Sequence, residues 1–134
     1  MFDHLHGFFH FAKQKSLPSM YYRHARAAIL VYDITNQSSF DNGVKHWIEE
    51  LKAKGPPDIF VIVVGNKIDA ESRRVVSKDI VETYVESVRG DFKGIVFREC
   101  SAKTGEGVQE LFEEICRGIQ RIKGVSGNDN VQDN

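Results

Sequence analysis

The chain has 134 residues, a net charge of −1 and 41% apolar residues, enough for one globular domain with a single core. Positive and negative side chains are interspersed without a basic stripe, which argues against a nucleic-acid partner. The longest wholly apolar run, IFVIVV, is too short to cross a bilayer. Because there are only two cysteines and no recognisable secretory leader, we expect a reducing, cytoplasmic location.

The first half of the chain alternates between strand and helix patterns. The apolar run RAAILVYDI predicts a buried strand over residues 27–33. Apolar side chains at helical spacing follow the capping residues Ser38 and Ser39, which predicts a helix over residues 38–54. After the turn GPPD, the run IFVIVVG predicts a second buried strand over residues 59–65.

The same alternation continues in the second half. Ser77 is a suitable N-cap for a helix over residues 77–88, and IVFRE predicts a third strand over residues 95–99. A long apolar stripe then predicts a helix over residues 107–122. The remaining residues, 123–134, are polar, and we expect them to be a disordered tail.

Three apolar strands joined by three helices predict an α/β fold, a parallel sheet in a three-layer αβα arrangement. Ligands of such sheets bind beyond the carboxyl ends of the strands. The loops to inspect therefore follow Asp33, Gly65 and Cys100.

Two of these loops carry residues suited to a guanine base: GNKID after the second strand and SAK after the third. The carboxylate of Asp69 can accept hydrogen bonds from both N1–H and the exocyclic amino group of guanine, while Asn66 can serve N7 and tie the loops together. Ordinary solvated turns are the alternative, but the joint occurrence at two consecutive strand ends favours a binding site. The candidate residues are Asn66, Lys67, Asp69, Ser101, Ala102 and Lys103.

The other candidates complete a pocket around the ring. The backbone N–H of Ala102 is expected to reach O6, and the stems of Lys67 and Lys103 to sandwich the base. Adenine would place a donor at the O6 position and leave part of the Asp69 carboxylate unpaired, at a cost of about 1–3 kcal/mol.

These motifs resemble the Ras superfamily of small GTPases, and most closely its Rab branch. The segment MYYRHARAAILVYDIT is Rab-like, with His24 where the family usually has glycine, and GNKID and ECSAKTGEGVQELFEEI follow in family order. Gly43 resembles a one-residue insertion before the helix that carries Trp47. The resemblance implies the C-terminal part of a P-loop GTPase domain.

The resemblance further implies binding of GTP or GDP, a role in vesicle trafficking, and Rab effectors or regulators as partners. Family members associate peripherally with endomembranes, but the last residues, SGNDNVQDN, contain no cysteine, so we expect no lipid anchor on this chain.

The phosphate-binding elements of such a domain do not occur in these residues. No glycine is followed by Lys-Ser or Lys-Thr, the switch threonine has no counterpart, and HGFFHFAKQK stands where a D-x-x-G-Q segment is expected. We therefore expect weak nucleotide contact through the base only, no Mg²⁺ binding and no GTP hydrolysis. No catalytic residue is assigned, and this includes Asp33.

The predicted domain organisation has three parts: a non-family segment over residues 1–15, a partial Rab-like GTPase domain over residues 16–122, and the tail. The apolar side chains of the first segment are expected to fold back over the free edge of the first strand. Two alternatives to a truncated GTPase remain open: a non-catalytic protein-interaction module and an unstable product.

Overall fold

Three parallel strands form the centre of the fold, in the order β1 (Ala27–Asp33), β2 (Phe60–Asn66) and β3 (Gly94–Glu99). The computed structural model describes residue 20 and residues 22–126. The middle strand, β2, is buried along its length up to Asn66, as expected for a strand covered on both faces. The predicted parallel strands are confirmed, and each lies within one residue of its predicted bounds.

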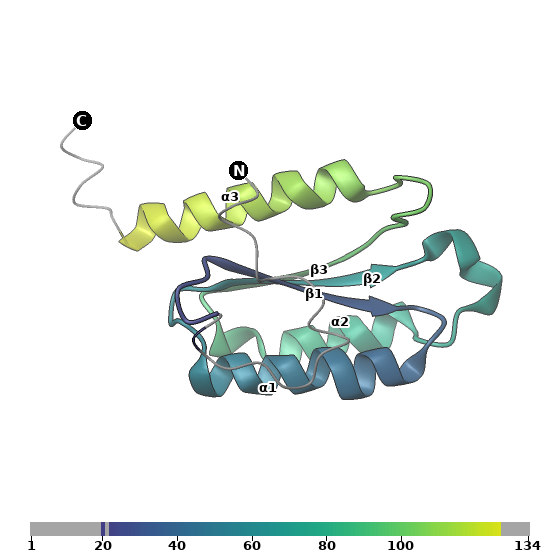
Figure 1. Cartoon of the computed structure of the whole chain (residues 1–134), viewed down its shortest axis with the longest axis horizontal. Helices are drawn as coiled ribbons and strands as arrows, with labels where there is room; N and C mark the ends of the chain where they lie inside the picture. The colour runs from purple at the N-terminus through teal and green to yellow at the C-terminus, as the bar shows by residue number, and fades with distance from the viewer. Residues whose placement is uncertain (1–19, 21, 127–134) are drawn as a thin grey trace.

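Helices cover both faces of this sheet (Figure 1). Helices α1 (Lys45–Lys54) and α2 (Lys78–Ser87) lie on one face, and α3 (Val108–Ser126) lies on the other. Two short 3-10 helices, η4 (Ile68–Arg73) and η5 (Arg89–Asp91), lie in the connections. The predicted three-layer αβα architecture is confirmed.

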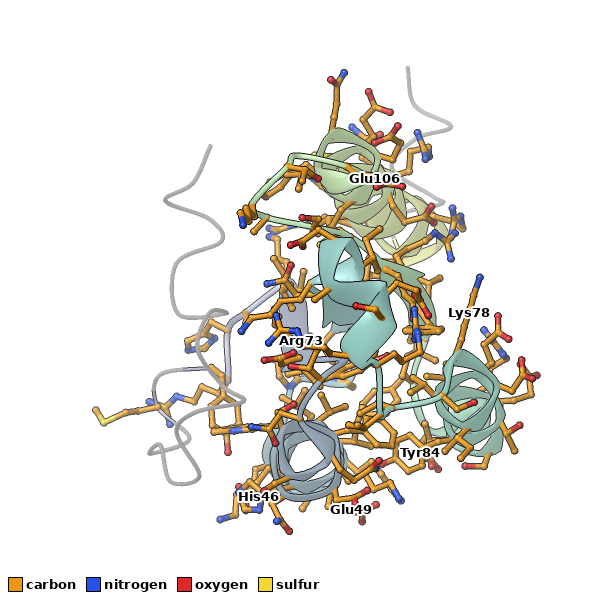
Figure 2. All side chains as sticks on the ribbon, turned by 90° about the vertical axis from the view of Figure 1, so that its right-hand side faces the viewer. His46, Glu49, Arg73, Lys78, Tyr84 and Glu106 are labelled. Carbon is orange, nitrogen blue, oxygen red and sulfur yellow. The ribbon has the colours of Figure 1, made fainter. Side chains whose placement is uncertain are left out.

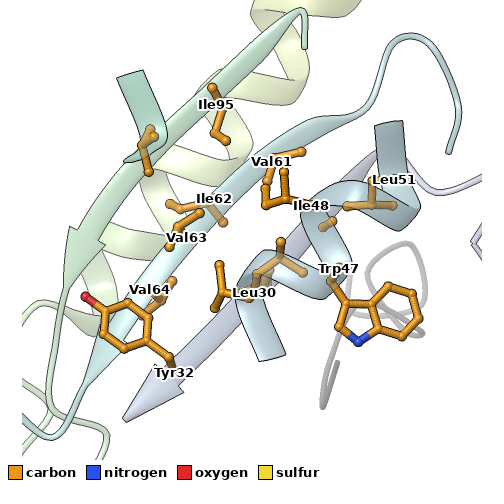
Figure 3. Packing of buried hydrophobic residues seen from close by; sticks show 14 of the residues in the cluster. Leu30, Tyr32, Trp47, Ile48, Leu51, Val61, Ile62, Val63, Val64 and Ile95 are labelled. Atoms are coloured by element: carbon orange, nitrogen blue, oxygen red, sulfur yellow. The ribbon is translucent and has the colours of Figure 1, made fainter. Parts of the chain in front are cut away.

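The core joins α1 to the sheet (Figure 3). Trp47, Ile48 and Leu51 recur at helical spacing, and all three are buried in one cluster with the strand residues. The indole of Trp47 also meets the ring of Tyr22 edge to face, with ring centroids 5.7 Å apart. This packing fixes the segment before β1 against α1.

The segment predicted as one helix over residues 38–54 begins with a π-helix, η3 (Ser39–Val44), and continues as α1. A π turn closes over one more residue than an α turn. The π turn contains the buried Gly43, so a one-residue insertion at this position, which stays a prediction, would be compatible with the regular spacing of α1 downstream.

The last helix is longer than predicted. Helix α3 runs to Ser126, so the prediction of a disordered tail is wrong for residues 123–126, and residues 127–134 lie outside the described part. The non-family segment over residues 1–15 and its predicted fold-back also lie outside it. Among the described residues, β1 pairs with β2 alone. No helix of this part is long and apolar enough to cross a membrane.

Candidate functional site

The predicted base-binding loops meet at the carboxyl edge of the sheet, the edge that faces the viewer in Figure 2. There η4, with Arg73, lies between α1 and α3, and Glu106 marks the loop that leads into α3. Two backbone hydrogen bonds join the loops, from Cys100 N–H to Gly65 O (2.8 Å) and from Ile68 N–H to Cys100 O (3.2 Å). The two loops are therefore held in register by backbone bonds.

Asn66 connects the two loops through its side chain. Its Oδ1 accepts the backbone N–H of Ala102 at 2.9 Å, and the thiol of Cys100 lies 3.9 Å from the same oxygen. The amide nitrogen of Asn66 has no hydrogen-bond partner within the described residues. The predicted tying role of Asn66 is therefore seen, and its NH₂ group remains available as a donor. The N–H of Ala102, expected to reach O6, is instead engaged by Asn66.

Asp69 and Ser101 form the second link between the loops. The hydroxyl of the fully buried Ser101 donates to Asp69 Oδ1 at 2.7 Å and accepts the N–H of Thr104 at 3.1 Å. The bond from Ser101 lowers the pKa of Asp69, and the nearby charges of Lys103 and Lys67 act in the same direction. Asp69 is therefore an ionised hydrogen-bond acceptor at neutral pH.

Lys67 directly follows Asn66 in the sequence and has an unusual backbone conformation. Its φ of 75° and ψ of 36° place it in the left-handed region, the one such non-glycine residue in the described part of the chain. Its ammonium lies 2.9 Å from Oδ2 of Asp33, at the end of β1. The structure thus joins the loop after β1 to the predicted site.

Asp33 was not predicted as a site residue. Burial alone would raise its pKa, but hydrogen bonds from Thr35 and Lys67 outweigh burial and lower the pKa. The available sequence signal was its position, because carboxyl ends of neighbouring parallel strands meet at one edge. Asp33 is an ionised partner for Lys67.

An ion cluster behind the loops was also missed. Arg74, just after η4, faces Glu99 at the end of β3 through two hydrogen bonds of 2.8 and 2.9 Å. Arg74 also binds Glu71 and donates to the carbonyl of Val76. This cluster fastens the segment that carries Asp69 to the strand that leads into Ser101.

Lys103 is exposed, and no ion pair or hydrogen bond involves its side chain among the described residues. The structure therefore places five of the six predicted residues in three separate contacts: Asn66 with Ala102, Asp69 with Ser101, and Lys67 with Asp33. Lys103 is outside these contacts. No cluster of three or more His, Cys, Asp or Glu that could hold a metal ion occurs in residues 20 and 22–126.

Comparison with known proteins shows the family of the chain. Residues 12–121 match the Ras family. This chain belongs to the Ras family. The match begins four residues before the predicted boundary at Ser16 and ends one residue before residue 122.

The relatives of this Ras-family chain include Ras-related proteins with Rab names. It is 43% identical over 108 residues to the Ras-related protein RABF2b of Arabidopsis thaliana, which covers 81% of this chain and 51% of the relative. It is 41% identical over 106 residues to the Ras-related protein Rab-5A of Dictyostelium discoideum, and the match covers 79% of this chain and 50% of that relative. It is 43% identical over 108 residues to the GTP-binding protein ypt5 of Schizosaccharomyces pombe, and the match covers 80% of this chain and 48% of that relative.

These similarities support the Rab branch within the family. The chain spans about half the length of the curated relatives it matches.

Proposed function

We propose that this chain carries the guanine-recognising half of a Rab-type GTP-binding site. The observation that supports the proposal is the pair of links between the loops, Asn66 with Ala102 and Asp69 with Ser101. They gather an amide donor and an ionised carboxylate at one edge of the sheet. Guanine presents complementary acceptors and donors along two adjoining edges of the ring.

In this proposal each group has a separate task. Asp69 accepts N1–H and the exocyclic amino group, and the free NH₂ of Asn66 donates to N7. The stems of Lys67 and Lys103 lie against the two ring faces. Ala102 N–H serves O6 only if its bond to Asn66 opens or is shared, so this contact forms on binding.

The proposed site is weak and does not hydrolyse GTP in this chain alone. In the family the phosphates supply much of the grip through backbone N–H groups, a lysine and Mg²⁺, and these 134 residues contain no G-x-x-x-x-G-K-[ST] motif. A base-only site leaves about −4 kcal/mol after association entropy, a Kd on the order of 1 mM. Magnesium is not expected to tighten binding.

The test is an NMR titration of the purified chain with GDP, GTP, ADP and ATP. Guanine nucleotides should shift the amide signals of Asn66 and Ala102 at millimolar concentration, and adenine nucleotides should not. Asp69→Ala should abolish the shifts, whereas Asp58→Ala should not. Asp58 is a suitable control because this exposed acid precedes β2, at the opposite end of the strand from the site. Equal weak binding of GTP and ATP would contradict the proposal.

Turnover is tested separately by single-turnover hydrolysis with and without Mg²⁺. Phosphate release should equal that in buffer. Release that requires magnesium and is lost in Asp69→Ala would overturn the proposed loss of hydrolysis.

The cellular role that we propose is the one implied by the Rab-type relatives, vesicle trafficking with Rab effectors or regulators as partners. A non-catalytic interaction module is the second candidate, favoured by the well-packed layer of α1 on the sheet, which presents a helix surface without needing nucleotide. The two candidates differ in one measurement: binding of a Rab effector or regulator should depend on added GDP or GTP in the first and be independent of nucleotide in the second.

A further inference from the structure

We propose that Asp33 is a positioning residue of the base site: its carboxylate holds Lys67 so that the lysine stem is in place before a guanine base arrives. This inference rests on the proposed function, because it concerns the same site. Asp33 lies at the end of β1, whereas all predicted base-contacting residues lie at or after the ends of β2 and β3.

The carboxylate of Asp33 is held in a defined orientation. Its Oδ1 accepts both the backbone N–H of Thr35 (2.8 Å) and the hydroxyl of Thr35 (2.6 Å). Its Oδ2 therefore points to the ammonium of Lys67, 2.9 Å away. Each carboxylate oxygen of Asp33 thus has its own partner, Thr35 for Oδ1 and Lys67 for Oδ2.

The backbone of Asp33 is fixed as well. Its N–H donates to the hydroxyl oxygen of Ser39 at 2.9 Å, at the first residue of η3. The same hydroxyl donates to the carbonyl of Asn36 at 2.7 Å. Asp33 is thus held from both sides, by the loop after β1 and by the start of the π turn, which makes it a rigid anchor.

Lys67 needs such an anchor. Without a partner, its four-carbon side chain would be free to rotate. The side chain of Lys67 is 53% exposed and that of Asp33 24% exposed, so the pair contributes little to folding stability. Its consequence is instead the orientation of the lysine stem.

A stem that is already ordered contacts a ring without a further loss of conformational freedom. Ordering one long side chain on binding weakens affinity by roughly two- to tenfold. Removing the Asp33 charge should therefore weaken binding of the base by that factor, while leaving its preference for guanine, which depends on Asp69, unchanged.

The experiment compares the parent chain with Asp33→Asn, which keeps the size of the side chain, and with the control Asp41→Asn. The control removes the same charge from an exposed acid that pairs with Lys45 at 3.7 Å, outside the site. Binding of guanosine and of GDP is measured by NMR titration. In the ligand-free proteins, the order of the Lys67 ammonium and adjacent methylene is measured by side-chain relaxation.

We expect the Lys67 side chain to be less ordered in ligand-free Asp33→Asn than in the parent. The same substitution should weaken the binding of guanosine and of GDP by the same factor, about two- to tenfold. Asp41→Asn should match the parent. Unchanged guanosine affinity in Asp33→Asn, or a loss confined to GDP, would overturn the positioning role while leaving the proposed function intact. A parent chain that binds no guanosine at all would overturn the proposed function and this inference together.

Discussion

Arg74 and Glu99 face each other through paired hydrogen bonds, from Nη1 to Oε2 (2.8 Å) and from Nη2 to Oε1 (2.9 Å). Their side chains are only 18% and 14% exposed, so removing one partner leaves the other largely shielded from water. We expect Glu99→Gln to lower the free energy of unfolding by about 1–3 kcal/mol, measured by urea denaturation.

Glu71 provides the matched control for this prediction. It binds the same guanidinium, but its side chain is 65% exposed, so Glu71→Gln should cost less than about 1 kcal/mol. Equal losses for the two variants would show that burial does not determine the strength of the cluster.

The hydroxyl of Tyr32 is buried and has no hydrogen-bond partner among the described residues. An unpaired buried hydroxyl is unfavourable, so we expect Tyr32→Phe to raise the free energy of unfolding by about 1 kcal/mol.

A Cβ on Gly65 would lie 2.6 Å from the hydroxyl oxygen of Tyr32, so Gly65→Ala should destabilise the fold by about 1–3 kcal/mol. Calorimetry of the single and double variants should show that Tyr32→Phe restores part of the loss, since the contact with the ring carbon Cζ at 2.8 Å remains. No loss of stability in Gly65→Ala would contradict the clash.

Two glycines of α3 should respond in opposite directions to the same substitution. A Cβ on Gly118 would lie 2.5 Å from the ring of Phe60, so Gly118→Ala should lower stability by about 1–3 kcal/mol. A Cβ on Gly124 would meet nothing within 4 Å, so Gly124→Ala should raise stability by about 1 kcal/mol through helix propensity alone. Thermal unfolding of the two variants side by side measures this difference, and a shift in the same direction for both would exclude close packing at Gly118.

The strands were predictable because β1 and β2 are apolar on both faces, a pattern with few alternatives in a chain of this size. The end of α3 was less predictable. Gly124 and the polar residues after Ile122 weaken the helical pattern, yet the helix continues to Ser126. Neither the residue pattern nor packing around Gly124 accounts for this extension, because a Cβ at Gly124 would meet nothing within 4 Å.

The candidate site was predictable in its residue types and only partly in its contacts. Strand order brings Asn66 and Asp69 beside Ser101, as expected for consecutive strand ends. The use of the Ala102 N–H by Asn66 depends on a side-chain orientation that no sequence pattern specifies. The pairing of Lys67 with Asp33 depends on a left-handed backbone at a lysine, which propensity would not predict.

The hydrogen bond from Ser101 to Asp69 predicts a specific dependence on pH. This bond lowers the pKa of Asp69, so the carboxylate remains ionised, and able to accept hydrogen bonds from guanine, at a lower pH than an ordinary aspartate would. A depressed pKa in the folded state also means that the contribution of Asp69 to stability is present above its unfolded-state pKa and is lost as the pH falls through its folded-state pKa.

Ser101→Ala should raise the pKa of Asp69, so that guanosine binding is lost at a higher pH than in the parent. Carboxyl ¹³C NMR measures the titration directly, with Asp33, which does not bond to Ser101, as the internal reference. A titration of Asp69 that is the same in Ser101→Ala and in the parent would show that this hydroxyl does not set its charge.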